Sequence, residues 1–296
     1  MRRDCPITSK YLLGTQVEGI VALGSTGEFA SLSFEEKKRV YSVVSQSWKE
    51  EGKKEKTLIA GVGSNCAKEV ETLTEEASSL GFKYAMVLTP HYYLPSMQKE
   101  NTQINFFEKM ASKSKLPIIL YNIPQFTGVN LSPVVISVLS KNDKIVGMKD
   151  SSGNVGQIQV YAEASRESRS KFSILGGSAS TLYASLCSEA DGGIVALANL
   201  LPQESCLLFQ LFSQGRHKEA ALLQNILSPV NRAVTSTFGI AGLKKAIDYL
   251  STKRKDFSLY GGIVRNPLLP FDEKNFHQLK AIIDNFLDNL NSSKSK

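Results

Sequence analysis

The strongest constraint on the fold is a repeating pattern of short, β-rich apolar runs. Seven such runs recur along the 296-residue chain, and loops and segments with helical periodicity separate them. The runs do not alternate apolar and polar residues, which is typical of parallel strands that are buried on both faces. We expect strands at residues 18–24, 57–62, 84–89, 117–122, 145–150, 172–177 and 192–197.

The segments between these runs predict helices. Ser33 and Glu36 have the spacing of a capping box, and the amphipathic stretch behind them extends toward Trp48. Ser132 followed by Pro133 indicates a second helix start, with an N-cap and a proline at the first helical position. Helical periodicity also covers residues 69–80, 98–112, 182–189, 217–227, 242–250 and 273–290.

Alternating strands and helices predict a parallel sheet, either open and doubly wound or closed into a (β/α)8 barrel. The chain lacks a Walker A sequence, and Gly61-Val-Gly63 lacks the third glycine of the dinucleotide-binding fingerprint. The barrel is therefore favoured. An eighth strand is not evident, because residues 1–10 are too polar to supply it.

Charge and cysteine usage exclude several functional classes. The net charge of +7 is concentrated in basic runs at residues 49–56, 253–255 and 294–296, which have no interleaved aromatic residues. These runs predict solvated faces and not a nucleic-acid site. The four cysteines are scattered and contain no C-x-x-C pair, which argues against zinc and against a disulfide scaffold and favours a reducing compartment. No apolar run approaches the ~18 residues of a membrane span.

Lys149 is the most informative single residue. It lies near the end of the apolar run that begins at Ile145, where a flexible cation is normally excluded. A lysine in an apolar pocket loses part of its preference for the charged form, and a neutral amine can form a Schiff base with a carbonyl. The alternative is a lysine that closes a strand and pairs with Asp150. Lys149 alone does not distinguish the two.

Other polar residues follow neighbouring strands. Tyr121 is at the carboxyl end of the preceding strand, so its phenol is a candidate for proton transfer at the same end of the barrel as Lys149. The turn at Ser25 and Thr26 offers hydroxyls and backbone N–H groups that suit a carboxylate, although a plain tight turn has the same pattern. Tyr92 is a candidate to lie over the open end of the barrel or at a contact between subunits. Asp150 is a candidate acid–base group, but its position is more typical of an ordinary strand-end carboxylate.

In combination, these motifs resemble the dihydrodipicolinate synthase / N-acetylneuraminate lyase superfamily of class I aldolases, over about residues 11–290. Within it, the chain is most similar to the animal mitochondrial 4-hydroxy-2-oxoglutarate aldolases, through residues 87–93, 192–199 and 233–240. The motifs that carry the superfamily resemblance are Gly24-Ser-Thr-Gly-Glu28, Tyr121-Asn-Ile-Pro124 with Thr127-Gly128, Gly147-Met-Lys-Asp-Ser-Ser-Gly153, residues 192–199 and residues 239–245.

The resemblance implies roles for individual residues. Lys149 would form the imine with pyruvate, and Tyr121 would be the adjacent proton-transfer phenol. Ser25 would link Tyr121 to Tyr92 in a proton relay. The remaining substrate contacts would come from Ser25 and Thr26 at the carboxylate, from Ser151 and Gly177 in the pocket lining, and from a backbone carbonyl at Ile194.

The same resemblance implies cleavage of 4-hydroxy-2-oxoglutarate to pyruvate and glyoxylate, without a metal or an organic cofactor. Dihydrodipicolinate synthases usually have an arginine two residues after the proline of the tyrosine motif, and Phe126 occupies that position here. Two alternatives stay open. One is another 2-oxo acid, such as N-acetylneuraminate or a 2-keto-3-deoxy sugar acid, and the other is a non-catalytic shortened relative.

The resemblance also defines the expected architecture. It implies a (β/α)8 TIM barrel over residues 1–235, lacking the first strand and part of the first helix, and a C-terminal helical extension over residues 236–296. Residues 251–259 lengthen a link before Tyr260 and are expected to form a surface loop. We further expect a homotetramer built as a dimer of dimers, with no nucleic-acid or membrane partner. The resemblance implies a mitochondrial location, with a cytoplasmic one as the alternative.

Overall fold

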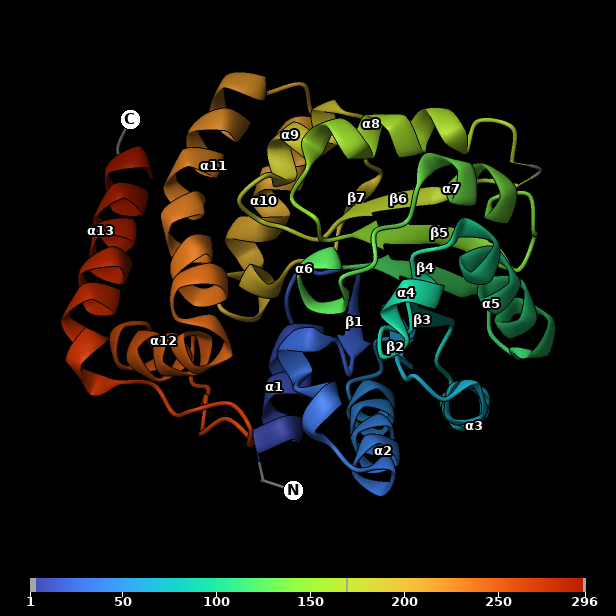
Figure 1. Ribbon diagram of the computed structural model, residues 1–296. Helices are drawn as coiled ribbons and strands as arrows, with labels where there is room; N and C mark the ends of the chain where they lie inside the picture. Colours follow the sequence, from blue (N-terminus) through green and yellow to red (C-terminus); the bar gives the residue numbers. More distant parts are fainter. Residues whose placement is uncertain (1–3, 169, 295–296) are drawn as a thin grey trace.

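A curled parallel sheet surrounded by helices forms the centre of the molecule (Figure 1). The computed structural model describes residues 4–168 and 170–294. Within them, each strand is hydrogen-bonded to the next one along the chain, from β1 to β7. This confirms the α/β barrel-like fold and places a strand within each of the seven predicted runs, although the last strand is only two residues long and a 3-10 turn begins at Ala196. The strands are β1 (Gly19–Ala22), β2 (Thr57–Gly61), β3 (Tyr84–Leu88), β4 (Ile118–Asn122), β5 (Ile145–Asp150), β6 (Ser173–Gly176) and β7 (Gly192–Gly193).

Helices connect the strands and continue beyond the sheet as a C-terminal group. Short 3-10 turns lie at η1 (Ser25–Gly27), η2 (Phe29–Ser31), η3 (Ala196–Asn199) and η5 (Glu273–Asn275), and a π-helical turn, η4 (Ala233–Thr237), joins α11 to α12. The helices are α1 (Asp4–Leu13), α2 (Phe34–Glu50), α3 (Ala67–Ser79), α4 (Leu94–Met97), α5 (Glu100–Lys113), α6 (Pro124–Thr127), α7 (Pro133–Leu139), α8 (Val155–Ala164), α9 (Leu182–Cys187), α10 (Pro202–Ser213), α11 (His217–Arg232), α12 (Gly239–Lys253) and α13 (Phe276–Lys294).

The predicted helix starts are confirmed at atomic detail. The Ser33 hydroxyl accepts a hydrogen bond from the Glu36 backbone N–H, and the Glu36 carboxylate accepts one from the Ser33 backbone N–H. The Ser132 hydroxyl likewise accepts from the backbone N–H of Val135 and begins α7. Each cap satisfies backbone donors that the first turn of a helix leaves without a partner.

The sheet has two edges, and the helices beside those edges contact each other. In the described residues, β1 and β7 are not neighbours in the sheet. The segment before β1 forms α1, and the Tyr11 hydroxyl of this helix accepts a hydrogen bond from Gln203 of α10, at 3.5 Å. The Gln16 and Gln210 side chains meet at 3.4 Å in the same region. The outer layer therefore bridges the opening between the two edge strands.

Alternation along the strands separates the outer core from the barrel interior. Residues such as Leu58, Leu120 and Met148 pack outward against the helices, in the largest apolar cluster. Ile119 and Tyr121 belong to a smaller inner cluster with residues from β1, β2, β3 and β5. Because successive side chains of a strand point to opposite faces, a residue's place in this alternation decides whether it reaches the interior.

Two expectations about the surface need correction. Residues 251–259 are not simply a surface loop, because Phe257 is fully buried and its ring packs edge-on against Tyr11. The basic runs are not wholly solvated either. Arg254 pairs with Glu204 at 2.9 Å, and the Lys56 ammonium donates to the Val17 backbone carbonyl at 2.6 Å. The sequence pattern cannot show these partners, since they lie far away along the chain.

The four cysteines are all free thiols in the structure. Burial raises the pKa of the Cys5 and Cys206 thiols, whereas Cys66 and Cys187 are exposed. Within the described residues, we find no helix with the length and apolar character that a membrane crossing requires.

Candidate active site

Lys149 and Tyr121 come together at the ends of adjacent strands. They are register partners on β5 and β4, so both side chains point to the same face of the sheet. The ammonium nitrogen of Lys149 lies 4.4 Å from the centroid of the Tyr121 ring. Lys149 is 8% exposed and Tyr121 is 3% exposed. The two groups that sequence analysis singled out therefore share one nearly dry position inside the barrel.

Ser25 reaches the same position from β1. The turn η1 directly follows this strand, and the Ser25 hydroxyl lies 3.2 Å from the Tyr121 hydroxyl. Either oxygen can donate this hydrogen bond. A serine hydroxyl and a phenol in contact can pass a proton between them, which is the part of the predicted relay that these two residues would carry.

Asp150 turns away from Lys149, toward the outer helices. Its carboxylate accepts hydrogen bonds from the Asn122 amide at 2.7 Å and from the Ser152 hydroxyl at 2.6 Å. Gln157 of α8 donates to the same carboxylate at 3.2 Å. The interpretation of Lys149 as the ion-pair partner of Asp150 is therefore not supported, because these donors hold the carboxylate on the opposite face.

Tyr161 completes the network around Asp150. Its hydroxyl donates to the Leu131 backbone carbonyl at 2.5 Å. Burial raises the pKa of the Tyr161 phenol, and the nearby Asp150 carboxylate raises it further, so the phenol keeps its proton. This network fixes the ends of β4 and β5 from outside. Sequence analysis missed this network, since Tyr161 lies on a helix that the periodicity did not indicate.

Ser151 and Gly177 lie directly against each other, as two lining residues of one pocket would. A Cβ atom placed on Gly177 would stand 1.9 Å from the Ser151 hydroxyl oxygen, so only glycine fits at this position. The Gln125 amide donates to the Ser151 backbone carbonyl at 2.8 Å and ties α6 to the end of β5. Sequence analysis missed this contact of Gln125.

Ile194 follows β7, and its backbone N–H donates to the Gly176 carbonyl at 2.9 Å. Thr26 lies within η1, next to Ser25, and is half-buried. Both residues are at the carboxyl ends of strands, where barrel enzymes place their active sites. Their predicted substrate contacts stay predictions.

Tyr92 lies apart from these residues in the single chain. Its side chain is 76% exposed, and its ring packs edge-on against Tyr93 with a centroid distance of 5.2 Å. Among the described residues, the Ser25 hydroxyl bonds to Tyr121 and not to Tyr92. The relay from Ser25 to Tyr92 is therefore not formed within one chain, and the predicted role of Tyr92 needs another arrangement or a second subunit.

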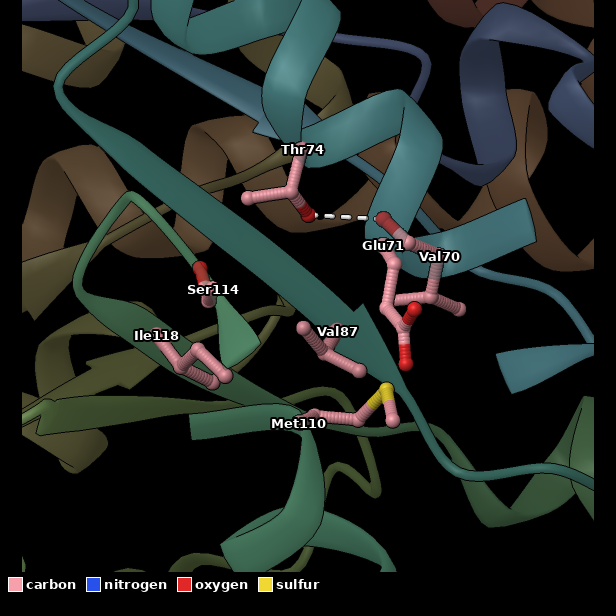
Figure 2. A pocket seen from close by; sticks show the side chains of 7 residues that line it. All are labelled: Val70, Glu71, Thr74, Val87, Met110, Ser114 and Ile118. Carbon is pink, nitrogen blue, oxygen red and sulfur yellow. Dashed lines mark hydrogen bonds between the residues drawn. The ribbon is translucent and has the colours of Figure 1, made fainter. Parts of the chain in front are cut away.

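The described residues contain no cluster of three or more His, Cys, Asp or Glu side chains with the geometry of a metal site. A narrow pocket between α3, α5 and the outer face of β3 and β4 is shown in Figure 2. The Thr74 hydroxyl in this pocket donates to the Val70 backbone carbonyl at 2.8 Å, and the Ser114 hydroxyl donates to the Leu116 carbonyl. The Glu71 carboxylate pairs with Lys68 and Lys113. Because these polar groups are already paired, the pocket offers no chemistry comparable to that around Lys149.

Comparisons with known proteins identify the family of the chain. The model of the dihydrodipicolinate synthetase family matches residues 8–286. The chain belongs to the dihydrodipicolinate synthetase family. It is 31% identical over 288 residues to the 4-hydroxy-tetrahydrodipicolinate synthase of Methanothrix thermoacetophila, with 97% of this chain and 90% of the relative covered.

Solved structures show the same fold. The 4-hydroxy-tetrahydrodipicolinate synthase of Methylacidiphilum fumariolicum SolV has a TM-score of 0.84 at 27% identity, over 98% of this chain and 91% of the other. A prophage protein of the same family from E. coli K12, solved in complex with pyruvate, has a TM-score of 0.84 at 26% identity, over 95% and 91%. This chain is accordingly a pyruvate-dependent class I aldolase or lyase of the family.

Proposed function

We propose that the protein cleaves 4-hydroxy-2-oxoglutarate reversibly to pyruvate and glyoxylate, with Lys149 as the imine-forming residue. The observation that carries this proposal is the position of the Lys149 amine, nearly buried and 4.4 Å from the Tyr121 ring. A buried lysine beside a phenol suits amine attack on a carbonyl followed by proton transfer.

The proposed reaction begins when the neutral Lys149 amine attacks the C2 carbonyl of the substrate. Loss of water gives a protonated imine, which withdraws electrons from the C3–C4 bond. A base, either Tyr121 acting through Ser25 or the substrate's own carboxylate, takes the proton of the C4 hydroxyl. The C3–C4 bond then breaks and releases glyoxylate. The remaining enamine is protonated at C3, and hydrolysis of the imine frees pyruvate and restores the lysine.

The turn η1 supports the binding of the substrate's C1 carboxylate. The Ser25 hydroxyl lies beside Tyr121, and Thr26 follows Ser25 in the same turn. Such a turn can hold an anion without a cationic side chain. We assign Ser151 and Gly177 to the lining of the same pocket, with Ile194 supplying a carbonyl near the reacting end.

Phe126 argues against aspartate semialdehyde as the aldehyde partner. Its side chain is 68% exposed on α6, next to Gln125, which contacts Ser151. A phenyl ring cannot bind a carboxylate, which is the task of the arginine that dihydrodipicolinate synthases usually carry at this position. This argues against aspartate semialdehyde as the aldehyde, although curated relatives are named 4-hydroxy-tetrahydrodipicolinate synthases. Glyoxylate is proposed from the resemblance to the hydroxyoxoglutarate aldolases, and its own carboxylate must then be bound by a group other than Phe126.

A second candidate function has its own support. The sequence Gly24-Ser-Thr-Gly-Glu28 is shared with the sialic acid lyases, whereas the animal hydroxyoxoglutarate enzymes often have asparagine in place of Thr26. The alternative product pair is therefore pyruvate with N-acetylmannosamine or with the aldehyde of a 2-keto-3-deoxy sugar acid. The non-catalytic alternative requires that Lys149 forms no imine.

Substrate profiling with the purified chain tests this assignment. Pyruvate is supplied with glyoxylate, N-acetylmannosamine or aspartate semialdehyde, and product formation is followed by mass spectrometry. We expect condensation with glyoxylate to have the highest kcat/KM. A preference for either of the other aldehydes would overturn the substrate assignment but would leave the imine chemistry in place. The K149A variant is the blank for all three reactions.

The assembly and the location of the protein also belong to this proposal. We propose a homotetramer built as a dimer of dimers, in which the exposed Tyr92 and Tyr93 lie near a subunit contact. The resemblance to the animal enzymes supports a mitochondrial location, and the bacterial and archaeal sources of the curated relatives support the cytoplasmic alternative.

A further inference from the structure

A half-buried glutamate, Glu28, directly follows the turn that presents Ser25 and Thr26. The side chain of Glu28 is 9% exposed. One of its carboxylate oxygens accepts a hydrogen bond from the Lys244 ammonium at 2.5 Å, and the other accepts one from the Arg265 backbone N–H at 2.7 Å. The carboxylate thus joins the end of β1 to two segments from the C-terminal part of the chain.

The partners of Glu28 are themselves held in place. Lys244 lies on α12 and also donates to the Ile263 backbone carbonyl at 2.9 Å. The Arg265 guanidinium pairs with Glu36, the capping-box residue of α2. In Figure 1 the segment after α12 returns to the N-terminal region, where these contacts lie. Glu28 is therefore the central member of a group that connects α2, α12 and residues 263–265.

The backbone of Glu28 is strained, and the strain is next to the substrate turn. Its φ is 56°, in the left-handed region that residues with a Cβ rarely adopt. Such a conformation persists only where surrounding contacts fix it. The Glu28 backbone N–H donates to the Ser25 carbonyl at 3.0 Å and closes the turn. A shift of Glu28 is therefore passed to Ser25 and to its bond with Tyr121.

We infer that Glu28 is a positioning residue, which holds the Ser25–Gly27 turn in the geometry that binds the carboxylate of the 2-oxo acid. This inference rests on the proposed function, because that function assigns the carboxylate to Ser25 and Thr26. Glu28 acts through these residues and not by contact with the substrate. Charge-assisted hydrogen bonds at low exposure are strong enough for this task.

The same helix offers a matched control. Lys245 follows Lys244 on α12 and pairs with Glu273 at 2.7 Å. This pair lies within the C-terminal part of the chain and has no bond to the turn η1. K245M therefore removes an ion pair of similar length from the same helix without releasing Glu28. Its effect measures the general cost of losing a lysine from α12.

The test compares E28Q, K244M and the double variant with wild type and K245M. In each protein, borohydride trapping is followed over a range of pyruvate concentrations. We expect E28Q and K244M to raise the half-saturating pyruvate concentration roughly tenfold and to change the plateau trapping rate less than about twofold. The double variant should be little worse than either single variant, since both remove one interaction. K245M should match wild type.

Hydrogen exchange of residues 24–28 gives a readout that does not depend on catalysis. Exchange should be faster than in wild type in E28Q and K244M, and unchanged in K245M, with exchange in β4 and β5 unchanged in all three. Wild-type exchange and wild-type half-saturation in both variants would overturn the inference. So would a fall in the plateau rate alone, or a loss of protection throughout the chain.

The two proposals fail in different ways. If wild type gives no pyruvate adduct at any concentration, the proposed function fails, and hydrogen exchange alone then decides whether Glu28 holds the turn. If wild type gives the adduct and the variants match it in both readouts, the positioning role fails and the proposed function stands.

Discussion

At the scale of single residues, Lys149 and Asp150 are neighbours on β5 with different tasks. Successive side chains of a strand point to opposite faces, so the two lie on opposite sides of the sheet. Lys149 points into the barrel beside Tyr121, whereas Asp150 points outward and is held by Asn122 and Ser152. The lysine therefore has no carboxylate partner from its own strand.

The D150A variant tests this division of tasks. Removing the carboxylate takes one acceptor from the buried Asn122 amide, which keeps its bond to Asn130, and takes the acceptor of the Ser152 hydroxyl. We therefore expect the free energy of unfolding to fall by about 1–3 kcal/mol. Urea titration measures this change, with D143A as a control at an exposed aspartate just before the same strand. Folded D150A should still form the pyruvate adduct. Loss of the adduct in folded D150A would contradict the structural role of Asp150.

The sequence identifies which residues belong to the site more readily than it shows which residues they contact. Lys149 stood out because a cation interrupts an apolar run, and Tyr121 because it closes the neighbouring strand. Glu28 gave no comparable signal, since its partners Lys244 and Arg265 are more than two hundred positions away. Tyr92 was placed in a relay by resemblance, and a single chain leaves it 76% exposed.

At the scale of elements, an ion pair joins the first two long helices of the barrel. The Lys37 ammonium of α2 lies 2.7 Å from the Glu69 carboxylate of α3. Burial by itself would raise the pKa of Glu69, but hydrogen bonds from Lys37 and Ser64 outweigh it and lower this pKa. A lowered pKa in the folded state stabilises the protein above the unfolded pKa of about 4.3. That stabilisation is lost as the pH falls through the folded pKa.

The E69Q variant should therefore lose stability in a pH-dependent way. At pH 7 we expect its free energy of unfolding to be about 1–2 kcal/mol below that of wild type, because a charged hydrogen-bond acceptor is removed. The difference should shrink below about pH 4.3 and approach zero where Glu69 is protonated. Urea titrations at neutral and acidic pH measure it. A difference that stays constant with pH would show that the charge of Glu69 is not responsible.

Elements were predictable where periodicity and caps were strong. The capping box before α2 and the Ser132-Pro133 start of α7 are local signals, and both are confirmed. The helices α1, α8 and α10 were missed. The centre of residues 202–213 is a nearly unbroken apolar run, which has no helical periodicity. Residues 4–13 mix polar and apolar residues without forming a clear apolar face. Their helical state depends on packing that only the folded molecule supplies.

At the scale of the whole molecule, the opening between β1 and β7 is bridged by helices. Tyr11 of α1 packs against both of the large apolar clusters, and its ring meets the buried Phe257 at 5.3 Å. A contact shared by both clusters couples them, so that neither unfolds without exposing the other. The seven-stranded sheet can therefore belong to one cooperative unit.

Chemical denaturation tests this coupling. The single tryptophan, Trp48, packs against the first cluster, so its fluorescence reports that part of the molecule, while far-UV circular dichroism reports the whole chain. We expect the two transitions to coincide in wild type. Y11A should lower the denaturant midpoint of both transitions and reduce the free energy of unfolding by about 2–4 kcal/mol. Two separated transitions in wild type would contradict the coupling across the opening and would favour the non-catalytic alternative.

The central claim, that Lys149 forms an imine with a 2-oxo acid, has one direct test. The purified chain is incubated with pyruvate and borohydride, and the intact protein and its peptides are weighed by mass spectrometry. We expect one reduced pyruvate adduct per chain, on Lys149, and none in K149A. A folded wild-type chain that gives no adduct, or an adduct on another lysine, would contradict it.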